Sequence, residues 1–216
     1  AEVIAIVIGL YLGVVAAWKR GKNVDILAMG FSLVTYAMPT FWLGVLMMAF
    51  LSVNLRLFPT SGMLSPSMIF VKGFKRILNI GWHICLPAMT LALVLIGEYM
   101  LVMRSTLVDV LTEDYIITAD AKGMDGKSIL KKHALPNAMI PMVTLISMNL
   151  GFTITGALQV ETVFSWPGLG RLMYDALQAR DYPLLQGIFL VTSLCVVGAN
   201  FISDILYGYL DPRVKS

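Results

Sequence analysis

The stretch EDYIITADAKGMDGKSILKKHALP, residues 113–136, lies between two long apolar runs and carries four of the sixteen Lys and Arg residues. Apolar runs of about 20 residues can cross a bilayer as helices, so the stretch between them is predicted to be a loop at a membrane surface. A helix connection needs only a few residues. This one is long and patterned, with small residues in its first half, Gly123 at its centre and Leu135-Pro136 at its end. We expect such a loop to dock against a partner.

Composition supports the membrane class. The chain is 58% hydrophobic and 13% charged, whereas soluble domains average about 45–50% and about 25%. A soluble domain of this size could not bury that much apolar surface. The fold class predicted is therefore an all-α integral membrane protein.

Five apolar runs are long enough to span a bilayer, and they predict a bundle of five transmembrane helices. The second run contains Pro39, and the third starts at Leu86-Pro87 and stops at Arg104. The first residue is not Met, so we expect the natural chain to begin earlier. The five runs are roughly 1–18, 30–53, 84–103, 138–160 and 184–207.

The distribution of cations predicts the orientation. Ten Lys and Arg residues fall on one side of the predicted spans and six on the other. The richer side should be cytoplasmic, which places residues 104–137 and the C-terminus inside. The cluster Lys72-Lys75-Arg76 is an exception on the outer side. The ten are Lys19, Arg20, Lys22, Arg104, Lys122, Lys127, Lys131, Lys132, Arg213 and Lys215.

The pattern inside 113–136 predicts two short helices. Glu113 and Asp114 suit a helix start, and Gly123 suits a C-cap. Asp125 can start a second helix over 126–134, which Pro136 should end while holding Leu135 extended. An amphipathic helix lying on anionic headgroups is the alternative interpretation of these basic residues.

Polar residues inside the predicted spans are candidates for the translocation path. Glu98 lies within the third run, where a carboxylate is costly. Because Glu98 is six residues from Arg104, a place near the inner interface, with the side chain snorkelling or in a structural pair, is the alternative. Asn149 and Thr153 belong to a small and polar face of the fourth run. Close helix packing explains that face equally well.

The two outer loops have their own patterns. Residues 54–83 contain the turn signal Pro59-Thr60-Ser61-Gly62, and 161–183 contain a turn followed by a short amphipathic helix. Two interpretations of these loops remain: they cap the surface of the helix bundle, or they dock a partner. The helix is predicted from the shared face of Leu169, Leu172, Met173, Ala176 and Leu177.

Several blocks resemble the ABC importer permeases, and more narrowly the dipeptide/oligopeptide/nickel branch. Ala119-x-Ala121-Lys122-Gly123 followed by His133-Ala134-Leu135-Pro136 is similar to the cytoplasmic loop motif of that family. The motif is written Glu-Ala-Ala, three residues, Gly, nine residues, Ile-x-Leu-Pro. Ile117-Thr118-Ala119 stands at its Glu-Ala-Ala, and His133 replaces its Ile. Further similar blocks are 41–44 with 57–62, 163–170 with 180–183, and 200–213.

The resemblance covers essentially the whole chain, residues 1–216, as one importer transmembrane domain lacking the family's usual sixth span at the N-terminus. It implies a multi-pass permease of the cell inner membrane for peptides, nickel or a similar small solute. The implied partners are a second permease subunit (identical or different), two cytoplasmic ATPases, an extracytoplasmic solute-binding protein and membrane lipid. The loop 105–137 would hold the coupling helix, with Tyr115, Thr118, Ala119, Ala121, Lys122, Gly123, His133, Leu135 and Pro136 as coupling residues.

Catalysis, cofactors and nucleic acid are not expected. The chain has no G-x-x-x-x-G-K-[ST] motif, no His/Cys/Glu cluster with metal spacing and no plausible triad. Two other functional classes remain as alternatives to an importer permease. A secondary transporter or channel working without ATPases predicts midplane ionisable groups and repeated halves, and a membrane anchor predicts less patterned loops.

Overall fold

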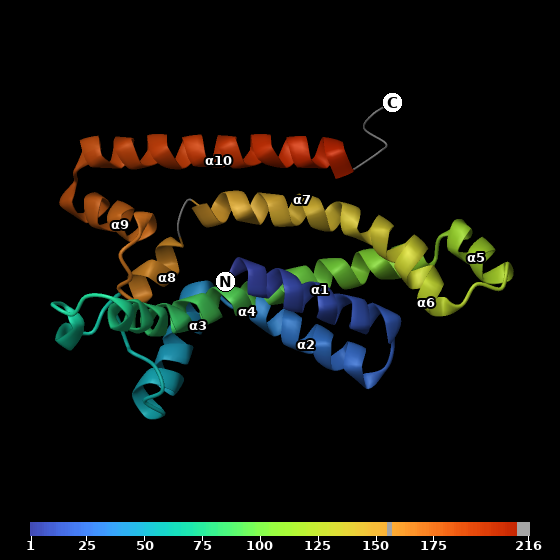
Figure 1. Cartoon of the computed structure of the whole chain (residues 1–216), viewed down its shortest axis with the longest axis horizontal. Coiled ribbons are helices and arrows are strands. Elements are labelled where there is room, and N and C mark those ends of the chain that lie inside the picture. The colour runs from blue at the N-terminus through green and yellow to red at the C-terminus, as the bar shows by residue number, and fades with distance from the viewer. Residues whose placement is uncertain (155–156, 211–216) are drawn as a thin grey trace. The chain divides into compact units, whose positions relative to one another are not determined.

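The computed structural model describes residues 1–154 and 157–210, and the regular elements of this part of the chain are all helices (Figure 1). The predicted all-α fold is confirmed. Arg213 and Lys215, two of the ten cations on the predicted cytoplasmic side, lie outside the described residues. The elements are α1 (Glu2–Trp18), α2 (Asn23–Ala37), α3 (Thr40–Met47), η1 (Met48–Asn54), η2 (Pro66–Met68), α4 (Phe74–Leu111), α5 (Asp114–Ala121), α6 (Gly126–Ile129), η3 (Leu130–Ala134), α7 (Leu135–Ile154), α8 (Leu158–Val163), α9 (Leu169–Ala179) and α10 (Tyr182–Leu210).

Two helical stretches among the described residues are long and apolar enough to cross a membrane, Phe74–Leu111 and Gly126–Thr153. A third span is added if α2 and the segment Thr40–Asn54 count together, although they are bent by 104°. Helix α1 and the part of α10 from Tyr182 to Gly198 are shorter apolar helices. The count of five spans therefore stays a prediction.

The bend lies inside the predicted run 30–53, at Pro39. Proline has no N–H to donate and disfavours the helical conformation of the residue before it. Pro39 (φ −56°, ψ 129°) is the N-cap of α3, and its carbonyl accepts the N–H groups of Trp42 and Leu43 at 2.9 and 3.1 Å. The run is thus two helices meeting at a proline.

Helix α4 is longer than the third predicted span. It has 38 residues with Pro87 in its interior, so the helix extends beyond both ends of the apolar run 84–103. Apolarity marks the part of a helix that faces lipid or protein, and it does not mark where the helix begins or ends.

The chain divides into two compact units. One contains residues 38–94 and 151–198. Its core is Leu86, Val160 and Phe164, against which Met47 and Leu51 pack. The predicted amphipathic helix after the outer turn is confirmed as α9, and its Ala176 is buried with Leu185 and Ile188 of α10 in a second cluster.

The other unit contains residues 2–37, 95–150 and, among the described residues, 199–210. Helices α1 and α2 form a hairpin (Figure 1), and small residues let α1 approach α4 closely. A Cβ added at Gly9 would lie 2.7 Å from Tyr99 Cβ, and one at Gly13 would lie 2.6 Å from Met103 Cβ. Small residues spaced by four favour such close helix packing in membranes.

Candidate functional site

The loop predicted to dock a partner begins with α5. Glu113 is its N-cap in an extended conformation (φ −72°, ψ 147°), and the helix runs over Asp114–Ala121. An acidic residue in the first turn is favourable next to the positive end of the helix dipole. The predicted helix start is confirmed.

Gly123 ends α5 as predicted. Its φ is +79°, a left-handed conformation that costs an L-residue about 1–2 kcal/mol. The Gly123 N–H donates to the Asp120 carbonyl at 2.8 Å, and the Met124 N–H donates to the Ala119 carbonyl at 3.3 Å. These two bonds are the Schellman pattern, which satisfies carbonyls at a helix end. The turn is therefore fixed by backbone bonds that need glycine at position 123.

The second half of the loop differs from its prediction. Asp125 is the N-cap of α6 as expected, and a hydrogen bond from the Ser128 side chain holds the pKa of the Asp125 carboxyl below its usual range. Leu135, however, is helical (φ −61°, ψ −45°). The chain continues from α6 through η3 into α7. The predicted extended Leu135 and helix end at Pro136 are wrong.

A π-helical turn precedes Pro136. The Leu135 N–H donates to the Leu130 carbonyl, five residues earlier, which is the π-helical spacing. In an α-helical turn the proline ring would meet the carbonyl four residues before it. The Asn137 side-chain amide donates to the His133 carbonyl at 2.7 Å. Because the turn is wider and the Asn137 side chain bonds the His133 carbonyl, the helix continues past Pro136.

The nine predicted coupling residues fall into three groups. Ala119 is buried together with Ile116, so its small side chain serves the packing of the loop itself. His133 and Leu135 are half-buried. The exposed members are Tyr115, Thr118, Ala121, Lys122, Gly123 and Pro136.

The loop also contacts α1. A Cβ added at Gly126 would lie 3.2 Å from the Trp18 ring, and Ile129 of α6 is buried. No local pattern in the sequence indicates this contact, because it joins residues more than a hundred positions apart. The loop is therefore a packed element with one exposed face.

The predicted path residues Glu98 and Asn149 are brought together. The Asn149 amide donates to Glu98 Oε2 at 3.0 Å and to the Tyr99 hydroxyl at 3.2 Å. The Tyr99 hydroxyl in turn donates to the buried Glu2 carboxylate. Thr153 is exposed on α7, four residues after Asn149. Glu2 and Tyr99 were missed, since only the fold reveals that α1 and α4 meet here.

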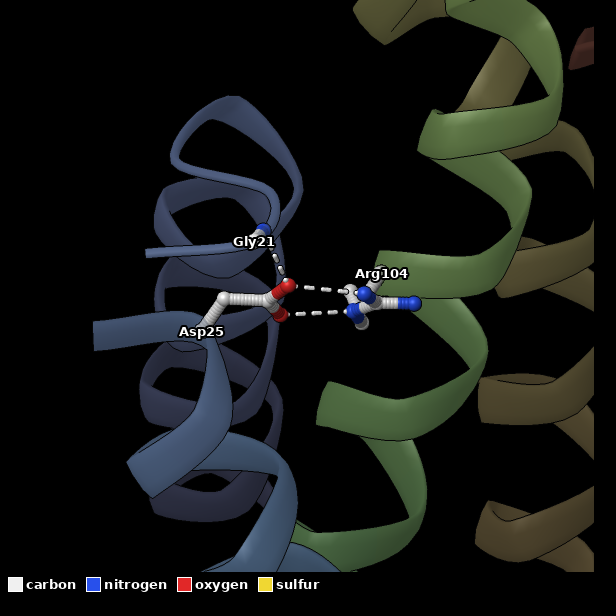
Figure 2. Close-up of polar contacts among 3 residues, drawn as sticks. All are labelled: Gly21, Asp25 and Arg104. Carbon is white, nitrogen blue, oxygen red and sulfur yellow. Dashed lines mark hydrogen bonds and ion pairs between the residues drawn. The ribbon is translucent and has the colours of Figure 1, made fainter. Parts of the chain in front are cut away.

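Arg104 pairs with Asp25 and not with Glu98. Arg104 Nε lies 2.7 Å from Asp25 Oδ1, and Nη2 lies 2.8 Å from Oδ2. The Gly21 N–H donates to Asp25 Oδ2 at 2.9 Å. Figure 2 shows the carboxylate between the α1–α2 turn and α4. The side-chain partner of Glu98 is therefore Asn149, whereas Arg104 is held by Asp25.

Comparisons with known proteins give a consistent result. The family described as binding-protein-dependent transport system inner membrane component matches residues 9–216. The dipeptide transport system permease protein DppB of Escherichia coli (strain K12) is 40% identical over 232 residues, which cover 100% of this chain and 68% of that protein. The oligopeptide transport system permease protein AppB of Bacillus subtilis is 37% identical, with 100% of this chain and 66% of that protein covered. This chain thus spans about two thirds of these relatives.

A solved structure shares the fold. A chain of the inward-facing MetNI methionine ABC transporter superposes with a TM-score of 0.69. The match covers 97% of this chain and 89% of that one at 17% sequence identity. At this identity the likeness concerns the fold alone.

Proposed function

Because the chain belongs to the family of inner-membrane components of binding-protein-dependent transport systems, we propose that it is the permease subunit of an ATP-driven peptide importer. The whole chain would act as one transmembrane domain, with residues 105–137 as its coupling segment. Peptides are proposed over nickel because relatives of about 40% identity are named as peptide permeases.

The observation that carries the coupling role is the two-faced construction of α5. Ile116 and Ala119 are buried, whereas Tyr115, Thr118 and Ala121 are exposed. The Gly123 turn fixes the end of this helix through two backbone bonds. A rigid short helix with one exposed face is what a groove on a partner protein can hold.

The joint between the loop and α7 supports transmission of movement. Helices α6, η3 and α7 follow one another without a non-helical residue. When the ATPases close and displace the loop, the displacement would therefore be transmitted to α7, because no flexible linker separates the two. Rigid-body displacement of this kind is a common form of switching.

The partners proposed are a second permease subunit, two ATPases that bind this loop, a binding protein on the opposite side, and lipid. ATP hydrolysis would reside in the ATPase subunits and not in this chain. Residues 104–137 and the C-terminus would be cytoplasmic, as the excess of cations on that side favours.

We assign the translocation path to the face of α7 that carries Asn149 and Thr153, with Glu98 opposite Asn149. Their polarity is costly in a lipid-facing position and useful along a hydrated path. The hydrogen bond between Glu98 and Asn149 would orient the carboxylate toward a passing solute.

The coupling role is tested by capture of the two ATPases with the purified full-length permease. Ala121→Glu places a charge on the exposed face of α5 without touching its buried side, so we expect capture to fall at least tenfold. Asn23→Glu is the matched control, because Asn23 is also exposed and lies on the same predicted side. Equal capture by the two variants and the unchanged chain would refute docking through this face.

A further inference from the structure

One surface is explained neither by the coupling loop nor by the path. Residues 66–78, here called the outer strip, contain Lys72, Lys75 and Arg76, the cluster that departs from the expected charge distribution. No Asp or Glu occurs between Asp25 and Glu98 in the sequence. None of the ion pairs in the described part of the chain involves these three cations. The strip is thus an uncompensated positive surface.

Large apolar side chains stand beside these cations. Phe70 is 94% exposed and Phe74 is 72% exposed, and Ile69, Ile77 and Leu78 are exposed as well. Phe74, Ile77 and Leu78 share one face of the first turns of α4, with spacings of three and four. A soluble surface rarely exposes such a contiguous patch without a partner.

Hydrogen bonds attach the residues just before the outer strip to α4. The Ser65 N–H donates to Asn79 Oδ1 at 2.9 Å. The ring of buried His83 bonds Ser65 Oγ at 3.0 Å and the Gly62 carbonyl at 2.9 Å. Trp82 stacks on Phe58 with ring centroids 4.8 Å apart. The segment before the strip is therefore tied to α4, and the strip keeps its cations and aromatic rings together.

The length of α4 places the strip at the membrane surface. Its 38 residues extend about 57 Å at 1.5 Å per residue, whereas a bilayer core is about 30 Å thick. The turns before the predicted span 84–103 therefore lie outside the core. Residues 69–73 are not helical, and irregular backbone is not found exposed to lipid within the core.

We propose that the outer strip binds anionic phospholipid headgroups, with Lys72, Lys75 and Arg76 contacting the phosphates and Phe70 and Phe74 inserted at the acyl boundary. The positive charge is complementary to anionic lipid, and the exposed aromatic rings suit the boundary between headgroups and acyl chains. An acidic protein surface would satisfy the cations but would leave the rings against polar groups. The strip would anchor the start of α4 at a fixed depth.

The test uses the full chain in phosphatidylcholine vesicles with and without phosphatidylglycerol. Cys85 and Cys195 are replaced by Ser, and Phe70→Cys carries a nitroxide label. We expect the label to collide with oxygen more than with a water-soluble nickel chelate. Spin-labelled phosphatidylglycerol should associate with the chain in preference to spin-labelled phosphatidylcholine. The triple variant K72Q/K75Q/R76Q should lower this preference at least about fivefold, the effect expected for even one surface cation.

A matched triple, R56Q/R171Q/R180Q, removes the same number of charges from the same predicted side and should keep the preference. An equal loss in both triples would show that the strip is not the binding surface. A label that is open to the nickel chelate in every vesicle would overturn the proposal. A label that becomes protected only when the solute-binding protein is added would overturn it in favour of a protein contact.

Discussion

The Asp25 carboxylate receives two bonds from the Arg104 guanidinium and thereby joins the start of α2 to α4 (Figure 2). The Asp25 side chain is 4% exposed and that of Arg104 is 18% exposed. Two parallel bonds between guanidinium and carboxylate form the strongest common ion-pair geometry. The pair therefore fixes the α1–α2 hairpin on the half of α4 that carries Glu98 and Tyr99.

Asp25→Asn should destabilise the protein by about 2 kcal/mol, because it leaves the Arg104 charge without its partner in a partly buried place. Unfolding in mixed micelles with increasing dodecyl sulfate measures this change. Asp175→Asn is the control, since the Arg171–Asp175 pair is 3.8 Å apart and well exposed; it should cost less than about 1 kcal/mol. Similar losses in the two variants would contradict the role of the Asp25 pair.

Gly13→Ala should destabilise the protein by about 1–3 kcal/mol through overpacking. The added Cβ would lie 2.6 Å from Met103 Cβ and 2.9 Å from the Met100 carbonyl, so the backbone of α4 would have to move. Gly30→Ala meets nothing within 4 Å and should instead stabilise α2 by about 0.5–1 kcal/mol. The same unfolding assay distinguishes them, and the close contact of α1 with α4 is refuted if the two variants behave alike.

Gly123→Ala should loosen the end of α5, because a left-handed residue with a Cβ costs about 1–2 kcal/mol. Hydrogen exchange at the amides of Gly123 and Met124, which donate the two closing bonds, should accelerate roughly five- to thirtyfold. Gly187→Ala adds a Cβ that meets nothing within 4 Å and should leave these amides unchanged. Unaltered exchange in the position-123 variant would mean that the turn does not depend on glycine.

Glu98→Gln separates a path role from a packing role. The amide oxygen can still accept from Asn149, so the free energy of unfolding should change by less than about 1 kcal/mol. Peptide uptake should nevertheless fall at least tenfold if the carboxylate faces the solute. Asp175→Asn, which changes an exposed carboxylate outside residues 105–137, is the control for uptake. Normal uptake with Glu98→Gln would assign the residue to packing alone.

Local signals in the sequence predicted much of the loop correctly. Helix α5, its start at Glu113 and its end at Gly123 depend on residues within a few positions of one another, and these residue types have strong conformational preferences. The amphipathic helix α9 was predicted for the same reason, from the regular spacing of its apolar side chains.

The features that sequence reasoning missed depend on distant partners or on rare local geometry. Asp25 meets Arg104 across 79 positions, so no local pattern in the sequence indicates this pair. Tyr99 joins Asn149 and Glu2 only after α1, α4 and α7 have packed. Pro136 was expected to end a helix, because the π-helical turn that accommodates it is uncommon.

ATP-driven peptide uptake by vesicles that contain the complete transporter tests coupling through residues 113–136 most directly. The unchanged chain and Asn23→Glu should both accumulate a labelled dipeptide when ATP reaches the ATPases, and Ala121→Glu should reduce uptake at least tenfold without lowering the amount of folded permease. Uptake by Ala121→Glu at the unchanged rate, or uptake that persists without ATP, would contradict coupling through residues 113–136.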